Sequence, residues 1–291
     1  MNYLIQILIF LQIYIILSLS LNLKVGFTGL LSLCHAAYYG TGAYTASLLM
    51  VNYGYGFFSS LFIAIVLNIA INATITTWLA GRLRNLYFTL GTIALQIIFI
   101  GVVNNWQKLT GGPIGISGIP LPVIFGITIN KETPFFLFVL VFTFITIIFF
   151  KWFAKTHLCL MLQCTRDDEV WLTVLGKRPA YFKFISISIS VAFATLAGVL
   201  YASYVNYIDL TSFNLDESIV VLTIILVGGT GNIIGPVSGA FIYVLLPEVL
   251  RFIDLSSTVA ENVRLIIFAI ILILIVRFKP NGIFGKFKIR V

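Results

Sequence analysis

The sequence predicts an all-α polytopic membrane protein with about seven full spans and one broken or re-entrant pair of helices, giving eight or nine membrane segments. Hydrophobic residues make up 60% of its 291 residues and charged residues only 10%, whereas soluble domains contain about 25% charged residues. A helix needs about 20 apolar residues to cross a bilayer, and transmembrane strands give short alternating segments instead. Long stretches without Asp, Glu, Lys or Arg include 1–23, 25–81, 85–107, 133–150 and 184–208.

Positive charge sets the expected orientation. Of the 18 basic residues, 11 lie in 151–183 and 277–291, and clusters of Lys and Arg mark cytoplasmic loops. With Arg82 and Arg84 also placed inside, counting the spans puts the N-terminus outside and the C-terminus inside. Charge clustered in this way at helix ends is a topology signal and does not indicate nucleic-acid binding.

The spans follow one another in a single transmembrane domain over 1–291. We expect residues 1–23 to be a retained span, since they lack the basic start of a signal peptide. A Gly- and Pro-rich outer loop, 105–133, and a cytoplasmic loop, 151–183, flank the fifth span. The predicted spans cover about 3–23, 27–51, 57–80, 86–104, 134–150, 184–206 and 265–276.

The segment 218–250 must begin and end outside, because the last apolar run has to start outside in order to end in the cytoplasm. Glycines at 228–232 break it in the middle, and Gly235-Pro236 is expected to break it again. At about 1.5 Å per residue its first arm reaches only halfway across. We expect a re-entrant or discontinuous pair, which membrane depth allows only where protein or water covers the backbone. Two complete but short spans are the alternative.

Enzyme and carrier chemistry find little support in the sequence. His35 is the only histidine within a span and suits packing or hydrogen bonding better than proton relay. His157, Cys159 and Cys164 lack the spacing of zinc ligands. The spans offer no clearly central acidic group of the kind that drives secondary carriers, and no P-loop motif for ATP is present. We therefore expect no catalytic residue, no metal and no cofactor in this chain.

The cytoplasmic loop contains a charged segment that leads into a short apolar run. Arg166, Asp167, Asp168 and Glu169 precede residues 170–175, and Gly176 and Pro179 follow. Carboxylates at the start, Gly at the end and Pro beyond are helix start and stop signals. They predict a short amphipathic helix that projects from the membrane, or one that lies on lipid headgroups.

An acidic-headed cytoplasmic helix ending in Leu-Gly resembles the coupling segment of ATP-binding-cassette importer permeases. More specifically, the chain resembles the branched-chain amino acid permease family, and its second-subunit branch best. The resemblance covers nearly the whole chain in order, but residues 170–173 stand where the family usually has alanines. It is carried by Leu21-Asn22-Leu23 through Gly42-Ala43-Tyr44, Tyr87-Phe88-Thr89-Leu90, Thr110-Gly111-Gly112-Pro113, Arg166 to Lys183, Ser212 to Glu248 and Lys279 to Gly285.

The resemblance implies a transmembrane permease subunit of an importer in the bacterial inner membrane, surrounded by lipid, that translocates branched-chain or other small hydrophobic amino acids. It implies a sister permease in a heterodimer, a periplasmic substrate-binding protein, and two ATP-binding subunits that hold ATP and Mg. The ATPase-coupling residues would be Arg166, Asp167, Asp168, Glu169, Leu175 and Gly176.

A zwitterionic substrate with an apolar side chain suits a path with exposed backbone dipoles and few fixed charges. The candidates for this path are Gly228, Gly229 and Gly231, with Gly111 and Gly112 near the outer mouth, although these glycines could serve packing alone. A urea or short-amide permease of the same family and a stand-alone secondary carrier remain as alternative functions.

Overall fold

A computed structural model describes residues 2–124, 127–129 and 132–251, together with 266, 269–270, 273, 277 and 282–285. The described residues form helices joined by short turns and two pairs of two-residue strands, so the all-α prediction is confirmed. Most of the predicted last span, 265–276, lies outside the described residues. Within the described part, the stretches long and apolar enough to cross a membrane are Tyr3–Phe27, Phe57–Arg82, Leu86–Asn105, Glu132–Phe153 and Pro179–Val205.

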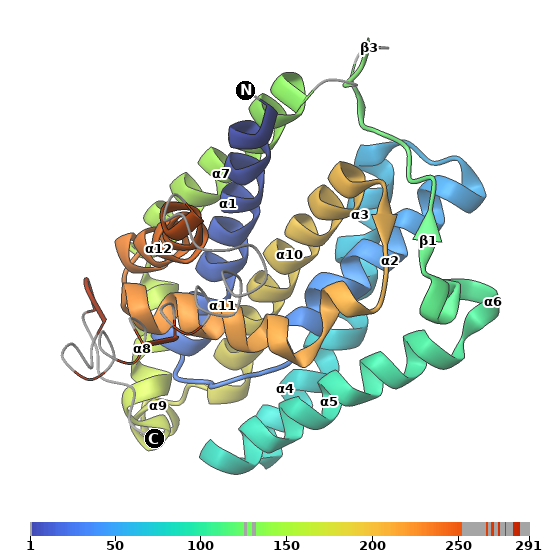
Figure 1. The fold of residues 1–291 in the computed structure, drawn as a ribbon. Helices are drawn as coiled ribbons and strands as arrows, with labels where there is room; N and C mark the ends of the chain where they lie inside the picture. The colour runs from blue at the N-terminus through green and yellow to red at the C-terminus, as the bar shows by residue number, and fades with distance from the viewer. Residues whose placement is uncertain are drawn as a thin grey trace.

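Helix α1 (Asn2–Asn22) runs through the middle of the bundle and contacts α7, α10, α11 and α12 (Figure 1). A π-helical turn, η1 (Leu23–Phe27), extends it beyond the predicted end at residue 23. Lys24 therefore lies inside the protein, where its Nζ donates to Ser32 Oγ at 2.9 Å and sits 4.5 Å from the centre of the Tyr38 ring.

Helix α2 (His35–Tyr53) packs on α10 (Pro179–Val205), and small residues bring the two backbones together. A Cβ on Gly198 would lie 2.1 Å from the carbonyl oxygen of Tyr39, so only Gly permits this approach. The predicted span 27–51 begins later than expected, because residues 28–34 are irregular. Although α2 is 19 residues long, it is less apolar than the five candidate spans, and most of its side chains are covered by protein.

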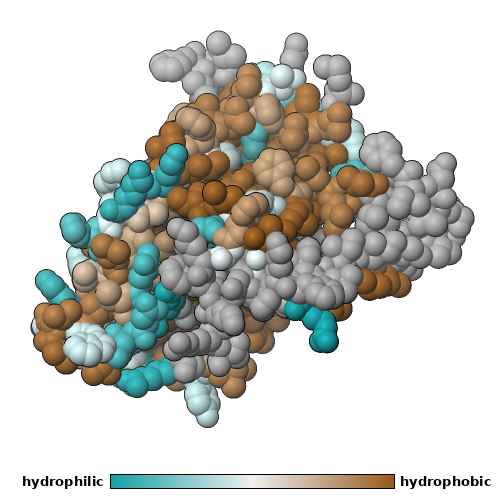
Figure 2. Space-filling model, turned by 90° about the vertical axis from the view of Figure 1, so that its left-hand side faces the viewer, coloured by the Kyte–Doolittle hydropathy of each residue, from teal (hydrophilic) through white to brown (hydrophobic). Residues whose placement is uncertain are grey.

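The peripheral helices present apolar side chains outwards. The region α3 (Phe57–Asn68), η2 (Ile69–Ala73) and α4 (Thr74–Arg82) forms one continuous stretch, followed by α5 (Asn85–Asn105) and later by α7 (Glu132–Phe153). Figure 2 views the left-hand side of Figure 1, where α7 lies, and shows hydrophobic residues over its upper part and hydrophilic ones along its left and lower left. Such a surface suits contact with lipid.

The predicted outer loop 105–133 contains short elements that pack on the segment after α10. Strand β1 (Ile116–Ser117) pairs with β4 (Tyr207–Ile208), and β2 (Val123–Ile124) pairs with β3 (Ile127–Thr128), both antiparallel. The remaining short elements here are α6 (Gln107–Thr110), η3 (Gly112–Ile114) and η4 (Thr211–Phe213).

The predicted break within 218–250 is present. Helix α11 (Leu215–Gly228) ends at the first of the glycines, α12 (Ile234–Arg251) begins six residues later, and the two helices pack against each other. At about 21 Å, α11 is shorter than the 30 Å core of a bilayer. The second expected break was wrong, because Gly235 and Pro236 lie in the first turn of α12, where proline is tolerated.

Candidate coupling segment and helix break

The loop 151–183, which the sequence predicts to be cytoplasmic, folds into two helices, where a single short helix was predicted. The Thr156 hydroxyl caps α8 (His157–Asp167) by accepting from the Cys159 N–H at 3.4 Å, and the α8 side chains Cys159 and Leu162 are buried. Arg166 and Asp167 therefore end α8 and do not head the next helix, α9 (Glu169–Val174). The carboxylate of Asp168 caps α9 by accepting from the Val170 N–H at 2.8 Å, which agrees with the carboxylates expected at this helix start.

The predicted stop at Gly176 is also present. Gly176 has φ +70°, in the left-handed region that favours glycine, and its N–H donates to the carbonyl of Thr173. The N–H of Lys177 reaches back to the carbonyl of Leu172 at 2.9 Å. These two bonds form a Schellman motif, and Pro179 then opens α10.

Helix α9 is attached to the bundle by one apolar and one charged contact. Leu172 is buried, while the carboxylate of Glu169 lies 2.6 Å from the ammonium of Lys183. Lys183 is itself buried on α10 and donates to the carbonyl of Ala80, in α4, at 3.0 Å. The Glu169 side chain thus helps to hold α9 in place.

The rest of α9 is open and apolar. The side chains of Val170, Trp171, Val174 and Leu175 are between 66% and 72% exposed. A groove of about 660 Å³ includes Gly176, the residue after Leu175, and is further lined by Lys177, Arg178, Thr77 and residues of α10. Fixed apolar side chains beside basic ones form a surface that a partner protein could bury.

At the helix break, backbone groups are covered by residues near the C-terminus. The carbonyls of Val227 and Gly228 accept from the N–H groups of Ile283 and Phe284, both at 2.9 Å. A Cβ on Gly228 would lie 1.9 Å from the carbonyl oxygen of Gly235. Gly229 and Gly231 have φ +109° and +77°. The three predicted pathway glycines at the break therefore also serve close packing or backbone geometry.

The two groups of candidate glycines are not brought together. Gly111 and Gly112 follow α6 and have φ +74° and +58°. A Cβ on Gly111 would lie 2.1 Å from the carbonyl oxygen of Gly115. In Figure 1, α6 lies at the right of the molecule, and the junction of α11 with α12 lies at its left.

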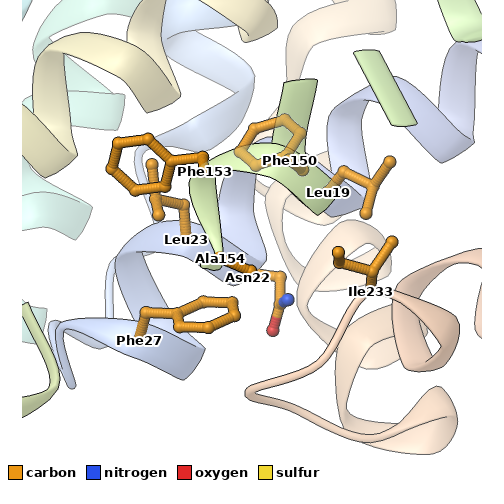
Figure 3. A pocket seen from close by; sticks show the side chains of 8 residues that line it. All are labelled: Leu19, Asn22, Leu23, Phe27, Phe150, Phe153, Ala154 and Ile233. Atoms are coloured by element: carbon orange, nitrogen blue, oxygen red, sulfur yellow. The ribbon is translucent and has the colours of Figure 1, made fainter. Parts of the chain in front are cut away.

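A small cavity lies between the end of α1, α7 and the break (Figure 3). It measures about 10 Å³, which is room for about one water molecule and far too little for an amino acid. Its lining comprises Leu19, Asn22, Leu23, Phe27, Phe150, Phe153, Ala154 and Ile233.

Asp209 caps the turn that leads into α11. Its carboxylate accepts from the Ser212 hydroxyl at 2.6 Å, the Ser212 N–H at 3.2 Å and the Thr211 hydroxyl at 2.5 Å. Partial burial acts to raise the pKa of Asp209, but the hydrogen bonds from Ser212 and Thr211 outweigh it and hold the pKa below its ordinary value.

Sequence reasoning missed three contacts at this site. Asn22 bonds to the break, Arg166 bonds to the end of α1, and residues 283–284 return to cover α11. A polar residue in an apolar run, such as Asn22, is the one signal that could have been used, since such residues usually have a partner.

Residues 3–276 match the family described as branched-chain amino acid transport system / permease component. The chain is similar to the high-affinity branched-chain amino acid transport system permease protein LivM of Salmonella typhimurium and of Escherichia coli K12. Each pair is 32% identical over 268 residues, which cover 82% of this chain and 62% of the relative.

A more distant relative is the autoinducer 2 import system permease protein LsrC of Yersinia pestis, 25% identical over 216 residues, which cover 71% of this chain and 58% of the relative. The chain spans less than two thirds of the length of these relatives, and no solved structure matches it. The family match over nearly the whole chain confirms the resemblance: the chain belongs to the permease components of branched-chain amino acid transport systems and is a multi-pass membrane transport subunit, not an enzyme.

Proposed function

We propose that this chain is the transmembrane permease subunit of an ATP-binding-cassette importer that carries branched-chain or other small hydrophobic amino acids across the bacterial inner membrane. The observation that carries the proposal is the surface of α9. Leu172 and the Glu169–Lys183 pair fix this helix, and its other apolar side chains are exposed. A firmly held apolar surface of this kind is suited to be covered by another protein.

The energy would come from two partner subunits that bind ATP and Mg. We infer seven spans and the α11–α12 pair, with the N-terminus outside and the C-terminus inside. This topology would put α8 and α9 in the cytoplasm, where these subunits would dock. Arg166, Asp167, Asp168, Glu169, Leu175 and Gly176 would shape and hold the docking surface. A sister permease and a periplasmic substrate-binding protein would complete the importer.

The glycine clusters suit two places on a substrate path. Gly111 and Gly112 would lie near the outer mouth, and Gly228, Gly229 and Gly231 would lie at the helix break. Their separation supports this division. Backbone dipoles can accommodate the carboxylate of a zwitterion without a fixed charge. At the break, the Gly228 carbonyl and the Gly231 N–H are bonded within the protein, so they would have to be released in another conformation to contact substrate.

Uptake of radiolabelled leucine into proteoliposomes tests the proposal. We expect uptake when this chain is assembled with a sister permease, ATPases and binding protein and supplied with ATP, and none with this chain alone. Excess valine should compete, and excess urea or acetamide should not. Uptake by the chain alone would establish a stand-alone carrier, and uptake of radiolabelled urea without uptake of leucine would establish an amide permease.

The docking surface can be tested separately. We expect Trp171→Ala to weaken co-purification of the ATPase subunits, because it removes an exposed apolar side chain of α9. Trp152→Ala is the matched control, since Trp152 on α7 is 63% exposed and Trp171 is 67% exposed. Equal loss in both variants, or loss in neither, would refute docking on α9.

A further inference from the structure

The side chain of Asn22, the last residue of α1, bonds to two consecutive residues of the helix break. Its Nδ2 donates to the carbonyl of Asn232 at 2.7 Å, and its Oδ1 accepts from the N–H of Gly231 at 3.0 Å. One side-chain amide thus satisfies both a backbone N–H and a backbone carbonyl in a segment that lies outside any helix. Asn22 is 2% exposed, and in such surroundings an unpaired polar group is costly. Figure 3 shows Asn22 beside Ile233, on the break's side of α1.

The backbone of η1 lies directly against the same break. A Cβ on Gly26 would lie 2.6 Å from the Gly231 nitrogen and 2.4 Å from Oδ1 of Asn22. No side chain separates the two segments, so a shift of Gly26 must be accompanied by a shift of Gly231 or of the Asn22 side chain.

The other side of η1 is held by the coupling segment. Arg166, near the end of α8, donates from Nη1 to the carbonyl of Gly26 at 2.9 Å. Its guanidinium also pairs with Asp167 at 2.9 Å, and the side chain is only 15% exposed. A Cβ on Gly29 would lie 2.5 Å from Cγ of Arg166, so the stem of the arginine packs on this backbone.

These contacts form one continuous connection from α8 through η1 to the break. The carbonyl of Gly26 belongs to a π-helical turn, and such turns are frequent at functional sites. Such a connection predicts a measurable coupling between movement of the coupling segment and substrate transfer.

We propose that Asn22 is a positioning residue that, with Gly26, passes movement of the coupling segment at Arg166 to the break between α11 and α12. The proposal rests on the proposed function, because it assigns α8 and α9 to the ATPase contact. Asn22 need not touch the substrate. It keeps the break in register with α1, so that α1 and the break move together when the ATPases act on α8.

The test compares Asn22→Leu with Gln12→Leu in the full transport complex in proteoliposomes. Gln12 is a buried amide on the same helix, and its Oε1 has no hydrogen-bond partner in the described part of the chain. The measured quantity is leucine transported per ATP hydrolysed. We expect a fall of about tenfold in Asn22→Leu, because two buried hydrogen bonds are lost, with ATP hydrolysis retained and Gln12→Leu unchanged.

An unchanged ratio in Asn22→Leu, with wild-type transport intact, would overturn this proposal alone, whereas failure of the wild-type complex to transport leucine would overturn the proposed function. A merely structural role would reduce the amount of assembled complex without changing the ratio. If Asn22→Leu does not assemble, Asn22→Asp is read in the same way, since it retains the acceptor for Gly231 and loses the donor to Asn232.

A double-mutant comparison provides an independent reading. Arg166→Met removes the bond to Gly26, and it should lower the ratio as well. If both residues act along one connection, the double variant Arg166→Met/Asn22→Leu should be no worse than the poorer single variant. Effects that multiply would contradict the proposal.

Discussion

Removing the charge of Glu169 is expected to loosen α9, because Lys183 would keep its charge without a counter-charge. The side chain of Lys183 is 7% exposed and that of Glu169 41%. Breaking a fully buried ion pair by removing one partner costs about 3–5 kcal/mol, and an exposed pair contributes about 0–1 kcal/mol. This pair lies between the two cases, and the carbonyl of Ala80 continues to accept from Lys183. We therefore expect Glu169→Gln to cost about 1–2 kcal/mol.

Hydrogen–deuterium exchange measures this cost where it arises. A loss of 1–2 kcal/mol in local opening should speed exchange in peptides covering 169–176 by about 5- to 30-fold. Peptides from α5 should keep their rates, since α5 lies apart from the pair. In the transport complex, the same variant should hydrolyse ATP with less uptake per ATP.

The double variant Glu169→Gln/Lys183→Met supplies the control. It removes the buried charge together with its partner, and replacing both members of such a pair by neutral groups is often neutral. We expect its exchange rates over 169–176 to recover toward wild type. Unchanged exchange in Glu169→Gln, or a uniform rise across the whole chain, would refute the idea that this ion pair anchors α9.

Three further predictions follow from single positions. Gly228→Ala places a Cβ 1.9 Å from the carbonyl oxygen of Gly235 and should destabilise the helix pair by about 1–3 kcal/mol or more. Faster hydrogen–deuterium exchange over 226–238 would report this loss. The control Gly101→Ala should be tolerated, because the space around Gly101 is open. Gly176→Ala should cost about 1–2 kcal/mol of stability because φ at this residue is +70°. Uptake per ATP should fall in Gly176→Ala and recover in Gly176→Asn. Equal activity of wild type and both variants would count against a conformational role for Gly176. The pKa of Asp209 is lowered in the folded protein, so its contribution to stability is complete above the ordinary pKa of about 4 and is lost as pH falls through the lowered folded pKa. Lowering the pH below about 4 should therefore reduce the thermal unfolding temperature of wild type more than that of Asp209→Asn. Parallel pH profiles of the two unfolding temperatures would contradict this.

The sequence was most informative where composition alone decides the structure. Long apolar runs predicted the helices 57–82, 85–105, 132–153 and 179–205 to within a few residues, because a bilayer core fixes both their length and their polarity. The break at Gly228 and the stop at Gly176 were also predictable, since glycine marks positions where other residues are strained. Carboxylates were likewise expected at the start of the short helix, and the structure shows that Asp168 is the one that caps it.

The remaining features depend on tertiary contacts that local patterns do not reveal. The irregular segment 28–34 carries no charge and few turn signals, yet α2 begins only at His35 because side chains of other helices accept its first N–H groups. Ala36 donates to Ser218 at 2.8 Å, and Ala37 donates to Gln96 at 2.8 Å. Arg166 was expected at the start of a helix. Its bond to Gly26 joins residues 140 positions apart, so no local pattern could reveal it.

The covering of the helix break by Ile283 and Phe284 has a consequence for biosynthesis. Phe284 accepts from the side chain of Asn232 and lies 52 positions further along the chain. At about 5–20 residues per second, translation reaches Phe284 roughly 3–10 s after Asn232. During that interval the carbonyls of Val227 and Gly228 have no such donors, so α11 and α12 enter the membrane before their junction is sealed. The newly made helix pair is therefore expected to stay near the insertion machinery, or in contact with water, until the later segment arrives.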